Sequence, residues 1–330
     1  MTRPLGNPRA PELPLIATYR VELQAFDSKA RRTAETYAAE ARRFAGWLAV
    51  AYPGSTLETA TPEMVREHLV GLFQAGLSAS RRRVALYALR SVYVWLQRRG
   101  VRDDDPTAGL NVPRQQAARI QPYSDAEAAR ILQHAADAID TAVSEREGLR
   151  REVEHLVMNV LRYTGVRVSE LADLKIRDVN LAEASVSVTG KGSKTRQVTI
   201  PPALAELLVG YLREVRPQLP ASSYLVSNPF AFEGSQTYGR LVPRAIRDIA
   251  FRHGEAAGVA GRHFPHRWRH TYATSIIRFG ADLETVRRAL GHASLGQVLV
   301  YTDLSREDVA LKILGAWDTL QRHQDPSQAA

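Results

Sequence analysis

Apolar residues between positions 15 and 96 recur at steps of three and four, and this spacing restricts the first third of the chain to helices. It runs through Leu15, Tyr19, Leu23 and Phe26, and continues from position 37 to 48. Such steps place side chains on one face of a helix, whereas a half-buried strand requires alternation. We therefore expect residues 15–110 to form a bundle of four or five helices without strands.

One of these predicted helices carries an unusual basic run. It begins at about Ser78, ends before Gly100 and contains three consecutive arginines, Arg81, Arg82 and Arg83. Three consecutive helical positions fan about 200° around the axis, so at least one of the three faces solvent or a bound phosphate. Taken alone, the run fits a solvated basic face as well as a DNA contact.

Helical periodicity is lost between residues 111 and 122, where prolines, arginines and glutamines predict a linker. Directly after it, Ser124 and Glu127 have the spacing of a capping box, which opens a new helix. The predicted organisation is a loose proline-rich tail (1–14), a helical domain (15–110), a linker (111–122), a second domain (123–320) and a polar tail (321–330).

Only one part of the second domain has the alternation of strands. Residues 184–189 and 195–200 alternate small and β-branched residues on either side of the turn Gly-Lys-Gly-Ser-Lys. This pattern predicts a β-hairpin that carries Lys191 at its tip. The other periodic segments of this domain have helical spacing, so we expect a mixed α+β domain that is mostly helical with a small antiparallel sheet.

Composition limits the functions that the chain can have. Of its 330 residues, 45% are hydrophobic and 24% are charged, as in soluble globular proteins. No run of eighteen apolar residues and no signal-peptide pattern is present, so we expect a cytoplasmic protein. The absence of cysteine excludes disulfides, thiol catalysis and zinc sites with sulfur ligands. The net charge of +9 favours a polyanionic partner, although many basic proteins are merely soluble.

Lysine is rare among the 44 basic residues: it occurs only at positions 29, 175, 191, 194 and 312. Two of the five, Lys191 and Lys194, lie in the predicted hairpin turn. An ammonium group can give up its proton when partly buried, whereas a guanidinium cannot do so near neutral pH. Lys191 is therefore a candidate proton donor, and a solvated surface turn is the alternative.

The chemistry-bearing residues gather late in the chain, in the run His-Arg-Trp-Arg-His at 266–270, a Leu-Gly-His turn and a tyrosine nine residues further on. Pro265 suits a first helical turn, which places His266 and Arg269 on one face near free backbone amides that favour an anion. His263, His266 and His270 could instead be a metal cluster. The interleaved arginines, and the lack of a nearby carboxylate, favour phosphate.

Three motifs, TGVRVSEL, HRWRH and LGHASLGQVLVY, resemble the tyrosine site-specific recombinases, the phage-integrase family that includes Xer-like resolvases. The resemblance covers nearly the whole chain. Arg269 and His292 are 23 residues apart, and Tyr301 follows nine residues later, as in the family pattern. Two positions depart from it: Trp268 stands where an aliphatic residue is usual, and Asp303 where histidine is frequent.

The resemblance implies a catalytic set and a metal-free, ATP-free reaction that exchanges a DNA phosphodiester for a 3′-phosphotyrosyl ester. The implied catalytic residues are Arg167, Lys191, His266, Arg269, His292 and Tyr301. Glu170 resembles the family's supporting acid. The family's core-binding domain, a SAM-like helical bundle, implies that Arg81, Arg82 and Arg83 contact DNA, and we expect Lys194 to do so as well.

The same resemblance implies partners. The first partner is double-stranded DNA with paired inverted-repeat half-sites. The second is three further copies of the chain, which form a homotetramer by exchanging a terminal helix at 305–320. This tetramer would resolve a Holliday junction. A second recombinase or an accessory factor, and association with the nucleoid, are compatible with this interpretation. Two alternatives remain: a relaxing enzyme of the type IB topoisomerase class, and a DNA-binding accessory protein that does not cut.

Overall fold

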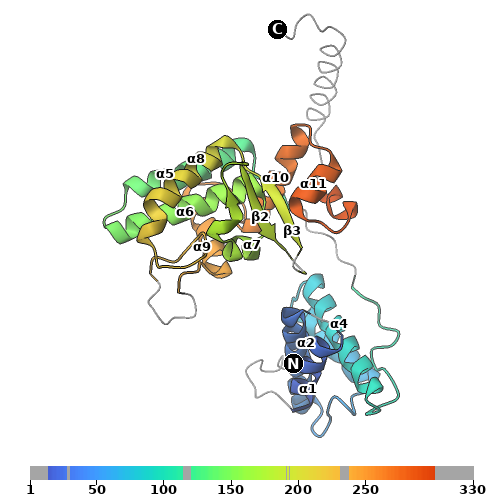
Figure 1. Cartoon of the computed structure of the whole chain (residues 1–330). Coiled ribbons are helices and arrows are strands. Elements are labelled where there is room, and N and C mark those ends of the chain that lie inside the picture. Colours follow the sequence, from blue (N-terminus) through green and yellow to red (C-terminus); the bar gives the residue numbers. More distant parts are fainter. Residues whose placement is uncertain are drawn as a thin grey trace, which may run out of the picture. The chain divides into compact units, whose positions relative to one another are not determined.

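The computed structural model describes residues 14–27, 30–113, 120–190, 192, 194–230 and 238–301. The chain divides into two compact units, residues 1–118 and 119–330, and this division falls inside the segment predicted as a linker. Each unit has its own hydrophobic core. Figure 1 shows the first unit in blue to green and the second in green to red.

The first unit is a helical bundle, and its described part contains no strand. Its helices are α1 (Pro14–Ala25), α2 (Arg31–Ala51), α3 (Pro62–Gln74) and α4 (Ala79–Arg98). The side chains of Thr61 and Ser78 accept hydrogen bonds from backbone amides in the first turns of α3 and α4, which is why these two helices begin there. Helix α2 packs against α1 and α4 over a core that includes Phe44 and Trp47.

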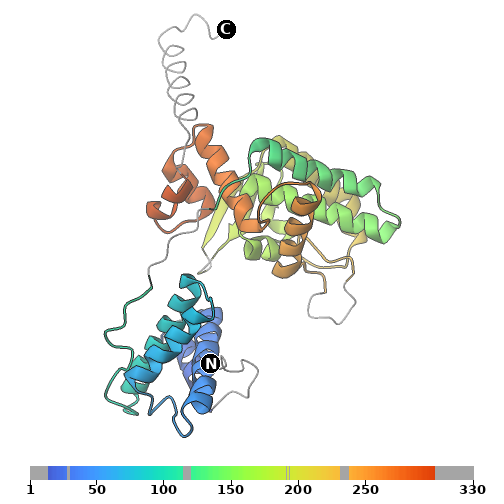
Figure 2. The ribbon, with the colours of Figure 1, turned by 180° about the vertical axis from the view of Figure 1, so that it is seen from behind.

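The second unit is built around α6, which contacts α5, α8, α9 and α10 (Figure 2). Its helices are α5 (Asp125–Asp140), α6 (Glu145–Thr164), α7 (Val168–Asp173), α8 (Pro202–Gly210), α9 (Pro243–Ala256), α10 (Pro265–Arg278) and α11 (Leu283–Leu290). Single turns lie between or after them: η1 (Ile176–Asp178), the π-helical η3 (Tyr211–Val215), η4 (Arg216–Gln218), η5 (Leu295–Gln297) and η6 (Leu299–Tyr301). The expected capping box of Ser124 and Glu127 opens α5.

A three-stranded antiparallel sheet completes the second unit. Its strands, in the order β1-β2-β3, are Val179–Asn180, Ser185–Thr189 and Thr195–Thr199. The register pairs Val186 with Val198, and both side chains are buried. This confirms the predicted fold class, which is a helical bundle followed by a mostly helical α+β unit with a small antiparallel sheet. The sequence did not predict strand β1. Lys191, at the predicted tip of the hairpin, lies outside the described residues.

In the described part of the chain, no helix has the length and apolar character needed to cross a membrane.

Candidate functional site

Arg269 is a fully buried cation at the centre of the candidate site. It lies one turn into α10, whose first residue is Pro265, and only 1% of it is exposed. Its guanidinium donates hydrogen bonds to the backbone oxygens of Gly165, at 2.8 Å, and Leu290, at 2.5 Å. Burial, together with the charge of Arg167, lowers the pKa of Arg269 to about 10, so the group remains a cation at neutral pH.

The turn at Gly165 brings a second arginine to the same place. Gly165 ends α6 in the left-handed conformation, with φ +58°, and a Cβ atom there would lie 2.5 Å from the ring of Tyr272. Only glycine therefore fits both the backbone and the space. Arg167 follows in the short connection and is the N-cap of α7. Ser169 lies inside the first turn of this helix and does not cap it, and Glu170 accepts a hydrogen bond from the Arg167 amide.

Glu170 is a buried carboxylate that holds two arginines. It accepts hydrogen bonds from the Arg167 guanidinium, at 2.8 Å, and from two nitrogens of Arg196, at 3.0 and 2.9 Å. Burial alone would raise the pKa of Glu170, but the bonds from Arg196 and Arg167 outweigh it and lower the pKa to about 2. Arg196, on β3, also donates to the backbone oxygen of Ala289, at 2.7 Å, and so connects the sheet to α11.

Tyr301 lies in η6 with only 3% of its surface exposed. It belongs to a small separate core formed by α10, α11 and η6, whose buried members include Ile277, Val286 and Leu290. Burial raises the pKa of its phenol, and the positive charges of Arg269 and Arg167 act in the opposite direction. The two guanidiniums therefore stabilise the phenolate form of Tyr301 against the larger effect of burial.

Histidines surround the phenol. The ring centroid of His270 lies 4.6 Å from that of Tyr301, and that of His292 lies 5.8 Å away. The ring of His266 lies edge-on against that of His270, with 5.0 Å between the ring centroids. Burial and the neighbouring cations lower the pKa values of His270 and His292 to about 4 and also lower that of His266, so these rings are neutral at pH 7.

His292 emerges where α11 ends. Gly291 adopts the left-handed conformation after Leu290, which is frequent at helix C-termini. The Nδ1 atom of His292 is buried and has no hydrogen-bond partner among the described residues. A buried nitrogen of this kind is costly unless a ligand group pairs with it.

A cavity of about 380 Å³ opens beside these groups. Its lining includes Arg167, His266 and Arg269 from the predicted set, together with Arg247 from α9. The other lining residues that the structure describes are Val166, Val168, Ser169, Phe264 and Pro265, and none of them carries a carboxylate. A cavity with this composition favours an anion.

The structure therefore brings together Arg167, Glu170, His266, Arg269, His292 and Tyr301, although they span 135 residues of the sequence. Lys191 and residues 305–320 lie outside the described residues. Lys194 is exposed and directly precedes β3.

Sequence reasoning missed three residues. Arg196 carried no signal beyond being an arginine in a strand, His270 was considered only as a metal ligand, and Arg247 was not singled out. Trp268, the departure from the family pattern, is completely buried and packs against Tyr123 at 4.7 Å between ring centroids.

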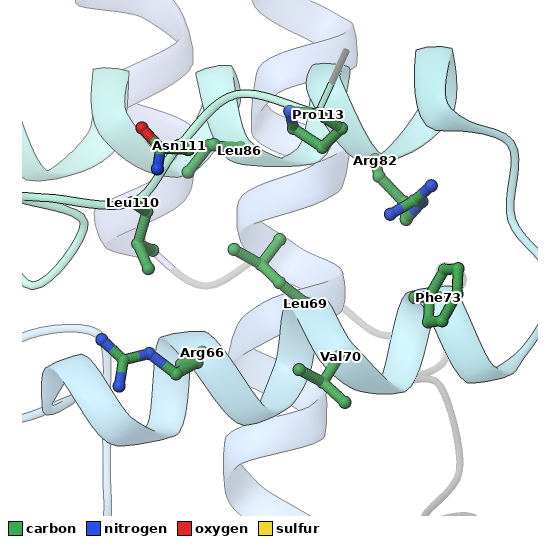
Figure 3. Close-up of a pocket in the computed structure, with 9 residues that line it drawn as sticks. All are labelled: Arg66, Leu69, Val70, Phe73, Arg82, Leu86, Leu110, Asn111 and Pro113. Atoms are coloured by element: carbon green, nitrogen blue, oxygen red, sulfur yellow. The ribbon is translucent and has the colours of Figure 1, made fainter. Parts of the chain in front are cut away.

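The basic run on α4 has local partners. Arg81 forms an ion pair with the buried Glu40 at 2.5 Å. Arg82 lies over the ring of Phe73 at 4.8 Å and donates to the backbone oxygen of Leu77, and Arg83 lies near the ring of Tyr87 at 5.9 Å. Figure 3 shows Arg82 and Phe73 at one end of a largely apolar cavity of about 320 Å³ between α3, α4 and the residues after α4.

Comparison with known proteins identifies the family of the chain. Residues 123–308 match the Phage integrase family, and residues 16–100 match the phage integrase N-terminal SAM-like domain. The chain belongs to the phage integrase family.

Curated relatives of this integrase are tyrosine recombinases. It is 31% identical over 272 residues to tyrosine recombinase XerC of Alcanivorax borkumensis, which is 82% of this chain and 84% of that protein. It is 30% identical over 299 residues to tyrosine recombinase XerD of Pseudomonas aeruginosa, which is 89% of this chain and 94% of that protein.

Solved structures share the fold of this integrase. The XerH site-specific recombinase in its post-cleavage complex with palindromic difH DNA is similar with a TM-score of 0.67 and 20% identity, over 96% of this chain and 100% of that one. A lambda integrase dimer bound to a COC′ core site is similar with a TM-score of 0.64 and 16% identity, over 88% of this chain and 76% of that one.

Proposed function

We propose that this integrase is a site-specific DNA recombinase that cleaves and rejoins strands through an ester at Tyr301. The observation that carries the proposal is the position of the Tyr301 phenol. It is buried, packed against His270 and His292, and electrostatically coupled to the two arginines whose side chains line an anion-attracting cavity.

In the proposed reaction the Tyr301 oxygen attacks a phosphodiester phosphorus, and the 5′-oxygen of the next nucleotide leaves. Negative charge then grows on the non-bridging oxygens, where Arg167 and Arg269 stabilise it through charge-assisted hydrogen bonds. The neutral ring of His266 or His270 takes the phenol proton, and His292 hydrogen-bonds to a phosphate oxygen. Lys191 supplies the proton for the leaving oxygen.

The products of this step are a 3′-phosphotyrosyl ester and a free 5′-hydroxyl. Because one ester replaces another, the free energy of the bond is retained and ATP is not needed. Attack by a 5′-hydroxyl from another duplex then reverses the step and joins exchanged strands. Proposed contacts of the first unit with DNA run through Arg81, Arg82 and Arg83, which would position the duplex through its phosphates.

The proposed partners are a duplex with inverted-repeat half-sites and three further copies of the chain, which exchange residues 305–320. A lambda integrase tetramer bound to a Holliday junction has the same fold as this chain, with a TM-score of 0.62, and this supports the proposed assembly. A cytoplasmic, DNA-associated location follows from such a substrate.

Covalent capture tests the proposal. Purified protein is incubated with a library of nicked duplexes whose half-sites are randomised, and DNA that remains attached after denaturation is sequenced. We expect attachment through a 3′-phosphate, and the Tyr301→Phe variant should give none. Tyr163→Phe, a partly buried tyrosine on α6 outside the site, is the matched control and should retain attachment.

Three results would contradict the proposal. Absence of any adduct with the unaltered chain would favour the non-cutting accessory protein. Efficient relaxation of a supercoiled plasmid by single molecules, without exchange between two captured sites, would favour the topoisomerase alternative. An undiminished adduct with Tyr301→Phe would place the nucleophile elsewhere.

A further inference from the structure

One cation in the candidate site has no assigned role. Arg247, in the second turn of α9, lines the same cavity as Arg167, His266 and Arg269. Helix α9 packs against both α7 and α10, the two helices whose N-terminal ends carry these residues. The cavity is therefore lined by arginines from three separate elements.

Arg247 differs from Arg167 and Arg269 in its interactions with the rest of the protein. Arg167 is paired with Glu170, and Arg269 is bonded to two backbone oxygens. Arg247 is exposed and, among the residues that the structure describes, has no ion pair or hydrogen bond. The nearest acid in its helix, Asp248, lies 3.9 Å from Arg244 instead. Its charge is thus available to a ligand.

The cavity has room for more than one phosphate group. About 380 Å³ falls in the range of pockets that hold whole small molecules, roughly 300–1,000 Å³. Arg167 and Arg269 are held by their own partners, and in the proposed reaction both contact the attacked phosphate. Successive phosphates on a DNA strand follow each other at a rise of about 3.4 Å along the duplex, so a neighbouring phosphate must lie close to the attacked one.

We infer that Arg247 binds a phosphate adjacent to the one that Tyr301 attacks. This inference rests on the proposed function and adds a second phosphate subsite to it. Arg247 then anchors the strand beside the reacting bond, so that its loss weakens DNA binding and leaves the chemical step of bound DNA largely intact. Arg247→Lys retains the charge without the forked geometry and should restore part of the binding.

The first test is equilibrium binding, measured in the Tyr301→Phe background so that cleavage plays no part. The probe is a captured duplex or, if no duplex is captured, a random-sequence duplex of fixed length. We expect Arg247→Ala to weaken binding roughly tenfold and to lower the slope of log K against log salt by about 0.9, the value for one lost phosphate contact. Arg213→Ala removes an exposed arginine outside the cavity and should change neither.

The second test identifies the phosphate. Single methylphosphonates, which remove one negative charge, are placed at each of the three positions on either side of the cleavage point in a captured duplex. If Arg247 binds a neighbouring phosphate, one of these substitutions should weaken binding to the Tyr301→Phe protein but not to the protein that also carries Arg247→Ala. The substitution at the attacked phosphate should weaken both proteins equally.

The outcomes separate this inference from the proposed function. Unchanged binding and salt dependence in Arg247→Ala would overturn the inference while covalent capture by the unaltered chain still stood. Coupling of Arg247 to the attacked phosphate itself would also overturn it, because Arg247 would then belong to the first subsite. Failure of covalent capture, with the expected salt slope retained, would overturn the proposed reaction and not the phosphate contact.

Discussion

Replacing Glu170 with glutamine tests whether one buried carboxylate holds the site together. The side chain is 4% exposed, and its hydrogen bonds come from Arg167 and Arg196. Lowering its pKa from 4.5 to about 2 corresponds to about 3 kcal/mol of stability at pH 7. Glutamine keeps the shape but leaves Arg196, whose side chain is 11% exposed, without a counter-charge. A loss of similar size is typical of a broken buried pair, about 3–5 kcal/mol.

Thermal unfolding of the second unit measures this loss. For a unit of its size, about 3 kcal/mol corresponds to a decrease in Tm of roughly 6–12 °C for Glu170→Gln at pH 7. Because the folded-state pKa is depressed, the stabilisation by Glu170 is complete above pH 4.5 and is lost as the pH falls toward 2. The difference in stability between Glu170→Gln and the unaltered chain should therefore decrease to about half near pH 3.

The control is Glu206→Gln, an exposed acid on α8, which should leave the Tm unchanged. A double-mutant cycle with Arg196→Met isolates the pair, and the two changes should be clearly non-additive. Equal stability of Glu170→Gln and the unaltered chain at pH 7 would refute the reasoning. A stability difference that stays the same down to pH 3 would also refute it, because the charge of the Glu170 carboxylate could not then be its cause.

Two further predictions concern the same unit. Gly165→Ala places a Cβ atom 2.5 Å from Tyr272 on a left-handed backbone, and it should lower the free energy of unfolding in urea by at least about 2 kcal/mol. The control Gly258→Ala, with φ +63° and open space around it, should lower it by only about 1 kcal/mol. Equal losses would rule out the steric contribution. The folded-state pKa of His270 lies near 4, below its ordinary 6.5, so the unfolded chain binds more protons between these values and stability declines as the pH falls through this window. His270 should thus account for about 2 kcal/mol less stability at pH 5 than at pH 7, and a His270→Gln protein whose urea-derived stability falls as much over this range would contradict that assignment.

Sequence patterns predicted those parts of the fold that depend on local physics. The three- and four-residue spacing in the first unit, the capping box at Ser124 and the alternation around the turn at 190–194 each depend on neighbours in sequence, and each is found as an element boundary or a strand pair. The three motifs were visible because their spacing matches a known pattern. That Arg167, His266 and Arg269 line one cavity was not visible, since it depends on how helices pack.

The residues that escaped prediction act across the fold. Arg196 is one of several polar residues in β3, and nothing in its neighbours indicates that it binds Glu170 and the end of α11. Likewise, the charged start of α6 could not be interpreted from sequence. In the structure it ends at the buried Glu154, which His253 and Arg252 of α9 contact at 3.2 and 2.6 Å.

The small core around Tyr301 is separate from the main core of the second unit. The backbone oxygens of Ala289 and Leu290, which hold Arg196 and Arg269, belong to the same short segment as His292 and Tyr301. If residues 283–301 open locally, the positions of Tyr301 and His292 and the two backbone oxygens that hold the arginines are lost in one event, while the packing around α6 persists. Heating should therefore inactivate the protein at a lower temperature than the one at which most of its helices unfold. A ligand that binds and stabilises residues 283–301 should raise the inactivation temperature more than the temperature of global unfolding.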